Sequence, residues 1–173
     1  MRFAGQKKTA ASLLLCAALA SLAGCAGSAA GTDEAPDRGW VPREILETPP
    51  YAPFHAGYDT ARIAPEFPPM IRSVRQGVEV TIFFGGWCTD SKREVPRFLR
   101  LADESDFPKS SIRLYALDRT KKSGDGLTEK FGIERIPTFI FLKDGKEIGR
   151  ITESPATTLE GDVLTILAHG VQR

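Results

Sequence analysis

The chain has 173 residues, of which 42% are apolar and 26% are charged, as is ordinary for a soluble globular protein. Its formal net charge is +1, so the sequence gives no electrostatic case for nucleic-acid binding. The length suits one modest domain with additional segments.

The first 24 residues have the organisation of a secretory signal peptide. A segment with three basic and no acidic residues (1–8) precedes an apolar run of mainly alanine and leucine (9–23). That run is too short for a comfortable membrane span, although an uncleaved membrane anchor is the alternative interpretation. The sequence therefore predicts an exported protein.

The apolar run ends in Leu22-Ala23-Gly24-Cys25, which resembles the cleavage signal of bacterial lipoproteins. The resemblance implies cleavage before Cys25 and lipidation of that cysteine. The protein would then be anchored in the bacterial cell envelope, on the periplasmic face of the outer membrane if the source is Gram-negative. Cleavage would remove Cys16 and three of the 23 basic residues, leaving a net charge of about −2. Cys88 would become the only free thiol, so no internal disulfide could form.

Two segments are predicted between the signal peptide and the folded domain, which we expect over residues 69–173. Residues 25–39 are mostly small and polar and are predicted to form a flexible tether. Residues 40–68 are rich in proline, which opposes a long helix, and in aromatic side chains, which indicate packing. We expect an extended arm with short helical turns near residues 59–64 that packs onto the domain, with peptide contact as the alternative role.

The first half of the predicted domain alternates between helix and strand. A short helix should begin at a proline and stop before Gly77. The strand that follows is rich in β-branched and aromatic residues and is predicted to be buried. The next helix contains Pro96, which predicts a kink. These elements are expected at residues 69–76 (helix), 78–84 (strand), 91–104 (helix) and 112–117 (strand).

The second half begins with a charged loop at residues 118–125. An Asp-Gly pair between two apolar runs is typical of a hairpin turn, and an amphipathic helix closes the chain. The expected elements are a helix at 127–131, strands at 138–142 and 147–151, and a helix at 157–169. The order of elements predicts an α/β sandwich with a central mixed β-sheet flanked by helices.

Cys88 follows the first buried strand and is predicted to lie at or beside the N-terminus of the next helix. Free backbone amides and the helix dipole stabilise anions there, and therefore favour a thiolate. A thiolate is the nucleophile in thiol–disulfide exchange. Trp87 would provide a flat apolar surface beside it.

Two blocks of the sequence carry further motifs. Residues 83–96 place Trp87-Cys88 at a helix start, with a proline eight positions beyond the cysteine, and residues 131–145 contain Ile136-Pro137-Thr138 before a strand and a Lys-x-Gly turn. In these two blocks the chain resembles the thioredoxin superfamily. The resemblance covers roughly residues 77–169 and implies a thioredoxin-like three-layer sandwich. It also implies that Cys88 is the attacking cysteine and that Pro137 is a cis-proline, with an ordinary trans-proline as the alternative. The backbone of Ile136 would then be free to pair with a bound peptide.

The sequence also departs from the thioredoxin pattern. Ser91 replaces the second, resolving cysteine, Asp90 stands where thioredoxin has proline, and Ile82 occupies the position of a buried carboxylate. A mixed disulfide on Cys88 could then be released only by an outside thiol. We therefore expect monothiol exchange with protein or small-molecule thiols and disulfides, as isomerisation or removal of thiol adducts.

The two residues that differ next to Cys88 have predicted effects. The Ser91 hydroxyl can donate a hydrogen bond to the thiolate. The charge of Asp90 suits a helix N-terminus but should disfavour a second negative charge on the neighbouring sulfur. As an alternative, Asp90 would simply cap the helix.

The main alternative function is a redox-inert module that binds peptides or proteins in a groove near Trp87 and Pro137. A peroxidase of the same superfamily is less favoured, because Gly85 stands where peroxiredoxins have threonine. A glutathione transferase would need a helical second domain.

The sequence predicts no catalytic role for the other polar residues. His55 and His169 are far apart and lack cysteine partners, so no metal or other cofactor is expected. Glu94 and Arg97 are interpreted as a solvated helix pair, and Asp118 as a solvated loop residue.

Overall fold

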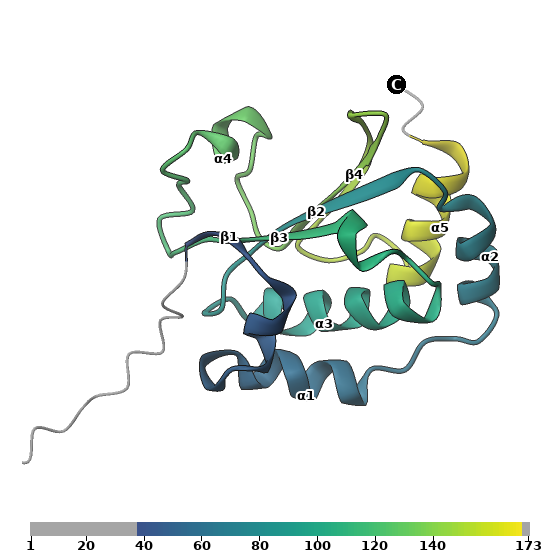
Figure 1. Ribbon diagram of the computed structural model, residues 1–173, viewed down its shortest axis with the longest axis horizontal. Helices are drawn as coiled ribbons and strands as arrows, with labels where there is room; N and C mark the ends of the chain where they lie inside the picture. Colours follow the sequence, from purple (N-terminus) through teal and green to yellow (C-terminus); the bar gives the residue numbers. More distant parts are fainter. Residues whose placement is uncertain (1–37, 171–173) are drawn as a thin grey trace, which may run out of the picture. The chain divides into compact units, whose positions relative to one another are not determined.

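The computed structural model describes residues 38–170 (Figure 1). The predicted signal peptide, Cys25 and nearly all of the predicted tether lie outside this range. Every helix within the described range is too short or too polar to span a lipid bilayer.

A five-stranded mixed sheet lies at the centre, in the order β1-β3-β2-β4-β5. Strands β2 and β3 are parallel, and the other neighbouring pairs are antiparallel. The strands are β1 (Gly39–Val41), β2 (Val78–Phe84), β3 (Ile112–Ala116), β4 (Thr138–Lys143) and β5 (Lys146–Thr152). Strand β2 is central and all of its residues except Glu79 are buried, which explains its nearly continuous apolar sequence.

The hairpin between β4 and β5 forms where the sequence predicts it. Asp144 and Gly145 both have positive φ angles, 52° and 72°, as the tightest hairpin turns require. The observed strands extend the predicted ones by one residue at three of their four ends.

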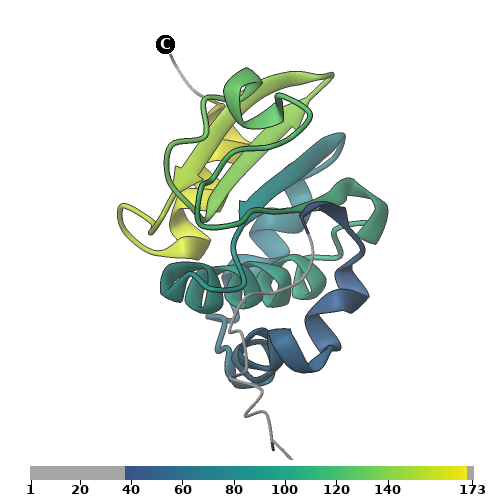
Figure 2. The ribbon, with the colours of Figure 1, turned by 90° about the vertical axis from the view of Figure 1, so that its left-hand side faces the viewer.

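Helices cover both faces of the sheet. The chain forms five α-helices and three short 3₁₀ turns in its described part: η1 (Arg43–Glu47), η2 (Pro49–Tyr51), α1 (Ala52–Thr60), α2 (Phe67–Val74), α3 (Thr89–Glu104), η3 (Lys109–Ser111), α4 (Leu127–Lys130) and α5 (Leu159–His169). Figures 1 and 2 show α3 on one side of the sheet, with α1 beyond it, and α4 on the opposite side. The predicted α/β sandwich with a central mixed sheet is therefore confirmed.

Two apolar clusters hold these layers together. Ile82 and Phe84 of β2 belong to the larger cluster, which also contains side chains of α1, α2, α3 and α5. Phe83 points to the other face and joins a smaller cluster that includes Ile136. Alternate side chains of one strand thus bind the two outer layers, as the two-residue repeat of a strand requires.

The segment at residues 40–68 is more regular than the expected extended arm. It adds β1 to the sheet edge and forms a helix at 52–60, whereas residues 61–64, where helical turns were predicted, are not helical. Pro53 lies in the first turn of α1, where proline is tolerated. Close packing of α1 on α3 depends on Gly57, because a Cβ atom there would lie 2.8 Å from Cγ of Pro96.

Candidate functional site

Cys88 immediately precedes α3, in extended backbone conformation (φ −86°, ψ 125°). Figure 2 views the molecule from the side where β2 ends and α3 begins. The thiol is free and partly exposed, and its Sγ donates a hydrogen bond to the Ile136 carbonyl oxygen at 3.4 Å. The first turn of α3 is closed by the Lys92 amide, which donates to the Cys88 carbonyl at 3.0 Å. The two sequence blocks that resemble thioredoxin therefore meet at this sulfur.

The loop that faces Cys88 contains a cis peptide bond between Ile136 and Pro137. The Pro137 carbonyl accepts a hydrogen bond from the Glu153 amide at 2.7 Å, so the loop is fixed from the β5 side. Among the described residues, the Ile136 N–H makes no hydrogen bond. Ile136 itself is 3% exposed.

Trp87 is held in a defined position beside Cys88. Its Nε1–H donates to the Leu117 carbonyl oxygen at 3.0 Å, and its ring packs against the smaller apolar cluster. Gly85 makes room for this arrangement, because a Cβ atom there would lie 2.8 Å from Trp87 Nε1 and 2.9 Å from Ile136 Cδ1. This role of Gly85 was not predicted from the sequence.

Ser91 is fully buried, and its Oγ accepts a hydrogen bond from the Gly85 amide at 3.3 Å. No hydrogen bond joins Ser91 to Cys88 within the described residues. The serine therefore supports the turn between β2 and α3. Ile82, at the position of the missing carboxylate, is likewise fully buried, in the larger apolar cluster.

Asp90 belongs to an ionic cluster on the first turns of α3. Nη2 of Arg93 lies 2.8 Å from Asp90 Oδ1 and 2.8 Å from Ser154 Oγ, while its Nε contacts Glu94 at 2.6 Å. The hydrogen bond to Glu94, with the negative charge of Asp90, raises the pKa of Arg93 above its ordinary value. The guanidinium thus offsets the charge of Asp90.

The interpretation of Glu94 as a solvated residue is wrong. Glu94 is only 2% exposed, and Arg97 contacts its second oxygen at 3.1 Å while Arg93 contacts the first. Two charged donors replace the water that a buried carboxylate loses, which makes its burial tolerable.

Asp118 is also buried rather than solvated. Its Oδ1 accepts hydrogen bonds from the Thr120 amide at 2.9 Å and the Thr120 hydroxyl at 2.6 Å, and its Oδ2 lies 3.0 Å from Arg38. The hydrogen bond from the Thr120 hydroxyl is the main cause that holds the pKa of Asp118 below its ordinary value. Asp118 therefore organises the loop that follows β3.

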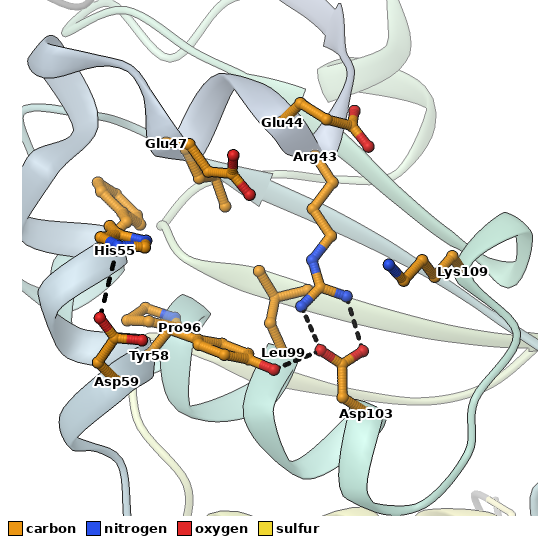
Figure 3. Close-up of a pocket in the computed structure, with 12 residues that line it drawn as sticks. Arg43, Glu44, Glu47, His55, Tyr58, Asp59, Pro96, Leu99, Asp103 and Lys109 are labelled. Carbon is orange, nitrogen blue, oxygen red and sulfur yellow. Dashed lines mark hydrogen bonds and ion pairs between the residues drawn. The ribbon is translucent and has the colours of Figure 1, made fainter.

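A separate cavity of about 240 Å³ lies between η1, α1 and α3 (Figure 3). On its wall, Arg43 makes two hydrogen bonds to Asp103, and the Tyr58 hydroxyl donates a third at 2.6 Å. Burial alone would raise the pKa of Asp103, but the hydrogen bonds from Arg43 and Tyr58 outweigh it and lower the pKa below its ordinary value. Cys88 does not line this cavity, so we assign the cluster to the attachment of α1 to α3.

Within residues 38–170, no three His, Cys, Asp or Glu side chains gather closely enough to hold a metal ion. His55 instead contacts Asp59 at 3.5 Å on the exposed surface of α1.

The sequence model of the family described as Thioredoxin matches residues 53–163. The chain belongs to the thioredoxin family. The matched range begins inside the segment expected to form an arm before the domain. A thioredoxin of Chlamydia muridarum is 35% identical over 78 residues, which cover 45% of this chain and 71% of that protein.

Two further proteins extend the comparison. The thioredoxin-like protein R548 of Acanthamoeba polyphaga mimivirus is 28% identical over 89 residues, or 51% of this chain. The match covers 62% of the mimivirus protein, less than two thirds of its length. The crystal structure of an HIV epitope-scaffold shares the fold, with a TM-score of 0.51 and 15% identity over 69% of this chain and 83% of that one.

Proposed function

We propose that this thioredoxin-family protein carries out monothiol thiol–disulfide exchange through Cys88. The observation that carries the proposal is the position of the sulfur, which is partly exposed, at the start of α3 and 3.4 Å from the Ile136 carbonyl oxygen. A thiol buried in the core or far from the cis-proline loop could not serve a substrate that pairs with that loop.

The chemistry follows from a single sulfur. Cys88 loses its proton to solvent, and the thiolate attacks one sulfur of a substrate disulfide. A mixed disulfide forms, and the departing thiolate takes up a proton. Because Ser91 cannot form a disulfide, a second thiol from the substrate or from a small molecule must attack the mixed disulfide and release Cys88 as a thiol. The sum is isomerisation or removal of a thiol adduct, with no net reduction by the protein.

The neighbouring residues support this reaction in different ways. Ionisation removes the proton that Cys88 donates to Ile136, so the thiolate would turn toward the free amides of the first turn of α3. The Ile136 amide can pair with an extended peptide, beside Pro137. Trp87 limits the approach on the other side and presents an apolar surface to the substrate.

Replacement of the thiol tests the proposal. Cys88→Ser and Cys88→Ala should abolish both exchange with glutathione mixed disulfides and recovery of scrambled proteins, while circular dichroism and Tm show that the fold persists. Client recovery that survives in Cys88→Ala would refute the enzymatic proposal and support the redox-inert peptide-binding module.

A gain of a second thiol tests the mechanism itself. In Ser91→Cys, the new sulfur can attack the mixed disulfide on Cys88, so the adduct should be released without added thiol. Mass spectrometry should detect a lasting adduct on the wild-type protein and little on this variant. A wild-type protein that releases its adduct equally fast without thiol would contradict external resolution.

We also propose that the protein is exported and anchored to the bacterial envelope through lipid on Cys25. The support is the Leu22-Ala23-Gly24-Cys25 motif after a basic segment and an apolar run. Incorporation of labelled palmitate and recovery in the membrane fraction should both be lost in Cys25→Ser. Membrane recovery that is unchanged in this variant would refute lipid anchoring.

A further inference from the structure

The loop that follows β3 places two cations against the elements that flank Cys88. The Arg119 guanidinium lies 5.1 Å from the centroid of the Trp87 ring. Lys121 Nζ donates a hydrogen bond to the Glu134 carbonyl at 3.1 Å, two residues before Ile136. One cation therefore sits on the tryptophan and the other on the cis-proline loop.

The loop is held in a fixed conformation. Asp118 accepts hydrogen bonds from the amide and hydroxyl of Thr120, and the Lys121 amide donates to the Asp118 carbonyl at 3.1 Å. Lys121 has a φ of 55°, a region that lysine rarely occupies without such support. The cations are thus positioned before a substrate arrives, and binding need not order them.

Neither of these two cations is neutralised by an ion pair, because Arg119 and Lys121 make none within residues 38–170. Three acidic residues of the neighbouring loops, Asp125, Glu129 and Glu134, are likewise unpaired in this range, so the loop has no excess of unpaired cations. The attraction expected for a carboxylate therefore depends on the position of Arg119 over the Trp87 ring.

We infer that the loop at residues 118–122 selects disulfides that carry carboxylates close to the reacting sulfur. This inference rests on the proposed function and names its substrate class. The Arg119 guanidinium lies over the Trp87 ring and makes no hydrogen bond or ion pair within residues 38–170, so its N–H donors are open to a carboxylate. A carboxylate on either side of the disulfide would be attracted as the Cys88 thiolate attacks, whereas a cationic substrate would be repelled.

The test compares three small disulfides of different charge: dianionic Ellman's reagent, neutral dithiodipyridine and dicationic cystamine. In Arg119→Gln/Lys121→Gln, the rate with the dianion should fall about three- to tenfold, because each charge pair at about 7 Å in water changes a rate by roughly threefold. The rate with the neutral probe should change less than about twofold, and the rate with cystamine should rise. High salt should remove the difference between wild type and variant.

One single substitution serves as a control, and a second tests the opposite change of charge. Lys143→Gln removes a cation from the end of β4 that pairs with Val78, the opposite end of β2 from Cys88, and should leave all three rates unchanged. Glu134→Gln removes a negative charge beside the site and should raise the rate with the dianion. An effect of Lys143→Gln as large as that of the loop variant would overturn the inference.

Further comparisons identify the source of the carboxylates. Oxidised glutathione supplies a small adduct, and a disulfide-linked peptide with aspartates beside its cysteine, compared with its lysine counterpart, supplies a protein-like substrate. If the loop variant reacts more slowly only with oxidised glutathione, or only with the aspartate peptide, the inference is supported and that substrate is identified as the source of the carboxylates. Equal slowing of all three small probes in the loop variant, or no change in any of them, would overturn this inference but not the proposed function. A wild-type Cys88 that reacts with none of them would instead refute the proposed function.

Discussion

Gly85→Ala tests whether the space beneath Trp87 determines the geometry of the site. The Gly85 backbone is not in the left-handed region, so alanine meets no conformational obstacle. The obstacle is steric, because the new Cβ would lie 2.8 Å from Trp87 Nε1 and 2.9 Å from Ile136 Cδ1. Both neighbours are themselves restrained, since Trp87 is hydrogen-bonded to Leu117 and Ile136 is 3% exposed.

Competing free energies decide the sign of the effect. Overpacking of this kind costs about 1–3 kcal/mol. Displacement of Trp87 would also break its hydrogen bond to Leu117, which contributes about 0.5–1.5 kcal/mol. Alanine also lowers the conformational entropy of the unfolded chain relative to glycine, which stabilises the folded protein by about 0.4–1 kcal/mol. We therefore expect the free energy of unfolding to fall by roughly 0.5–4 kcal/mol, the sum of these ranges.

The assay is urea unfolding followed by circular dichroism, together with the rate of reaction of Cys88 with dithiodipyridine. Gly124→Ala is the matched control, because nothing lies within 4 Å of its added Cβ and its φ is not positive. The control should be as stable as the wild type or slightly more so. If Gly85→Ala matched the control in both stability and rate, the reasoning about this contact would be refuted.

Two further predictions concern the charged clusters. In Asp103→Asn, loss of the partner of Arg43 should lower the free energy of unfolding by about 1–3 kcal/mol at neutral pH, since both side chains are 26% exposed. The folded-state pKa of Asp103 is lowered, so the difference in the free energy of unfolding between wild type and variant should be largest above about pH 5 and should shrink as the pH falls below about 4. Urea titrations in which this difference does not shrink at low pH would contradict the prediction. Arg93→Gln should slow the reaction of Cys88 with a neutral disulfide about two- to fivefold, because the Asp90 carboxylate is no longer offset. In an Asp90→Asn background the same substitution should have little effect, and an undiminished effect there would assign Arg93 another role.

The central elements of the fold were predictable because their signals are local. The apolar run at residues 78–84 and the Asp-Gly turn at residues 144–145 each specify a conformation through nearest neighbours. The helix at residues 52–60 was missed because prolines were counted as helix breakers wherever they occurred. Pro53 is compatible with a helix because it occupies the first turn.

The site was predictable only in part. The proximity of Cys88 to Ile136 followed from the family resemblance, because 48 residues separate them and no local pattern joins them. The burial of Glu94 could not be inferred, since it depends on how two arginines fold back on α3. The position of Arg119 over Trp87 depends on a loop conformation set by Asp118.

Cys88 is the one cysteine in the described part of the chain, and this shapes its response to oxidants. Peroxide attack on such a thiolate yields a sulfenic acid, which a neighbouring cysteine often captures before further damage. Ser91 offers no capture, so the modified sulfur would pass to the irreversible sulfinic state unless a diffusible thiol arrives first. The supply of small thiols around the protein would therefore set both its turnover and its working lifetime.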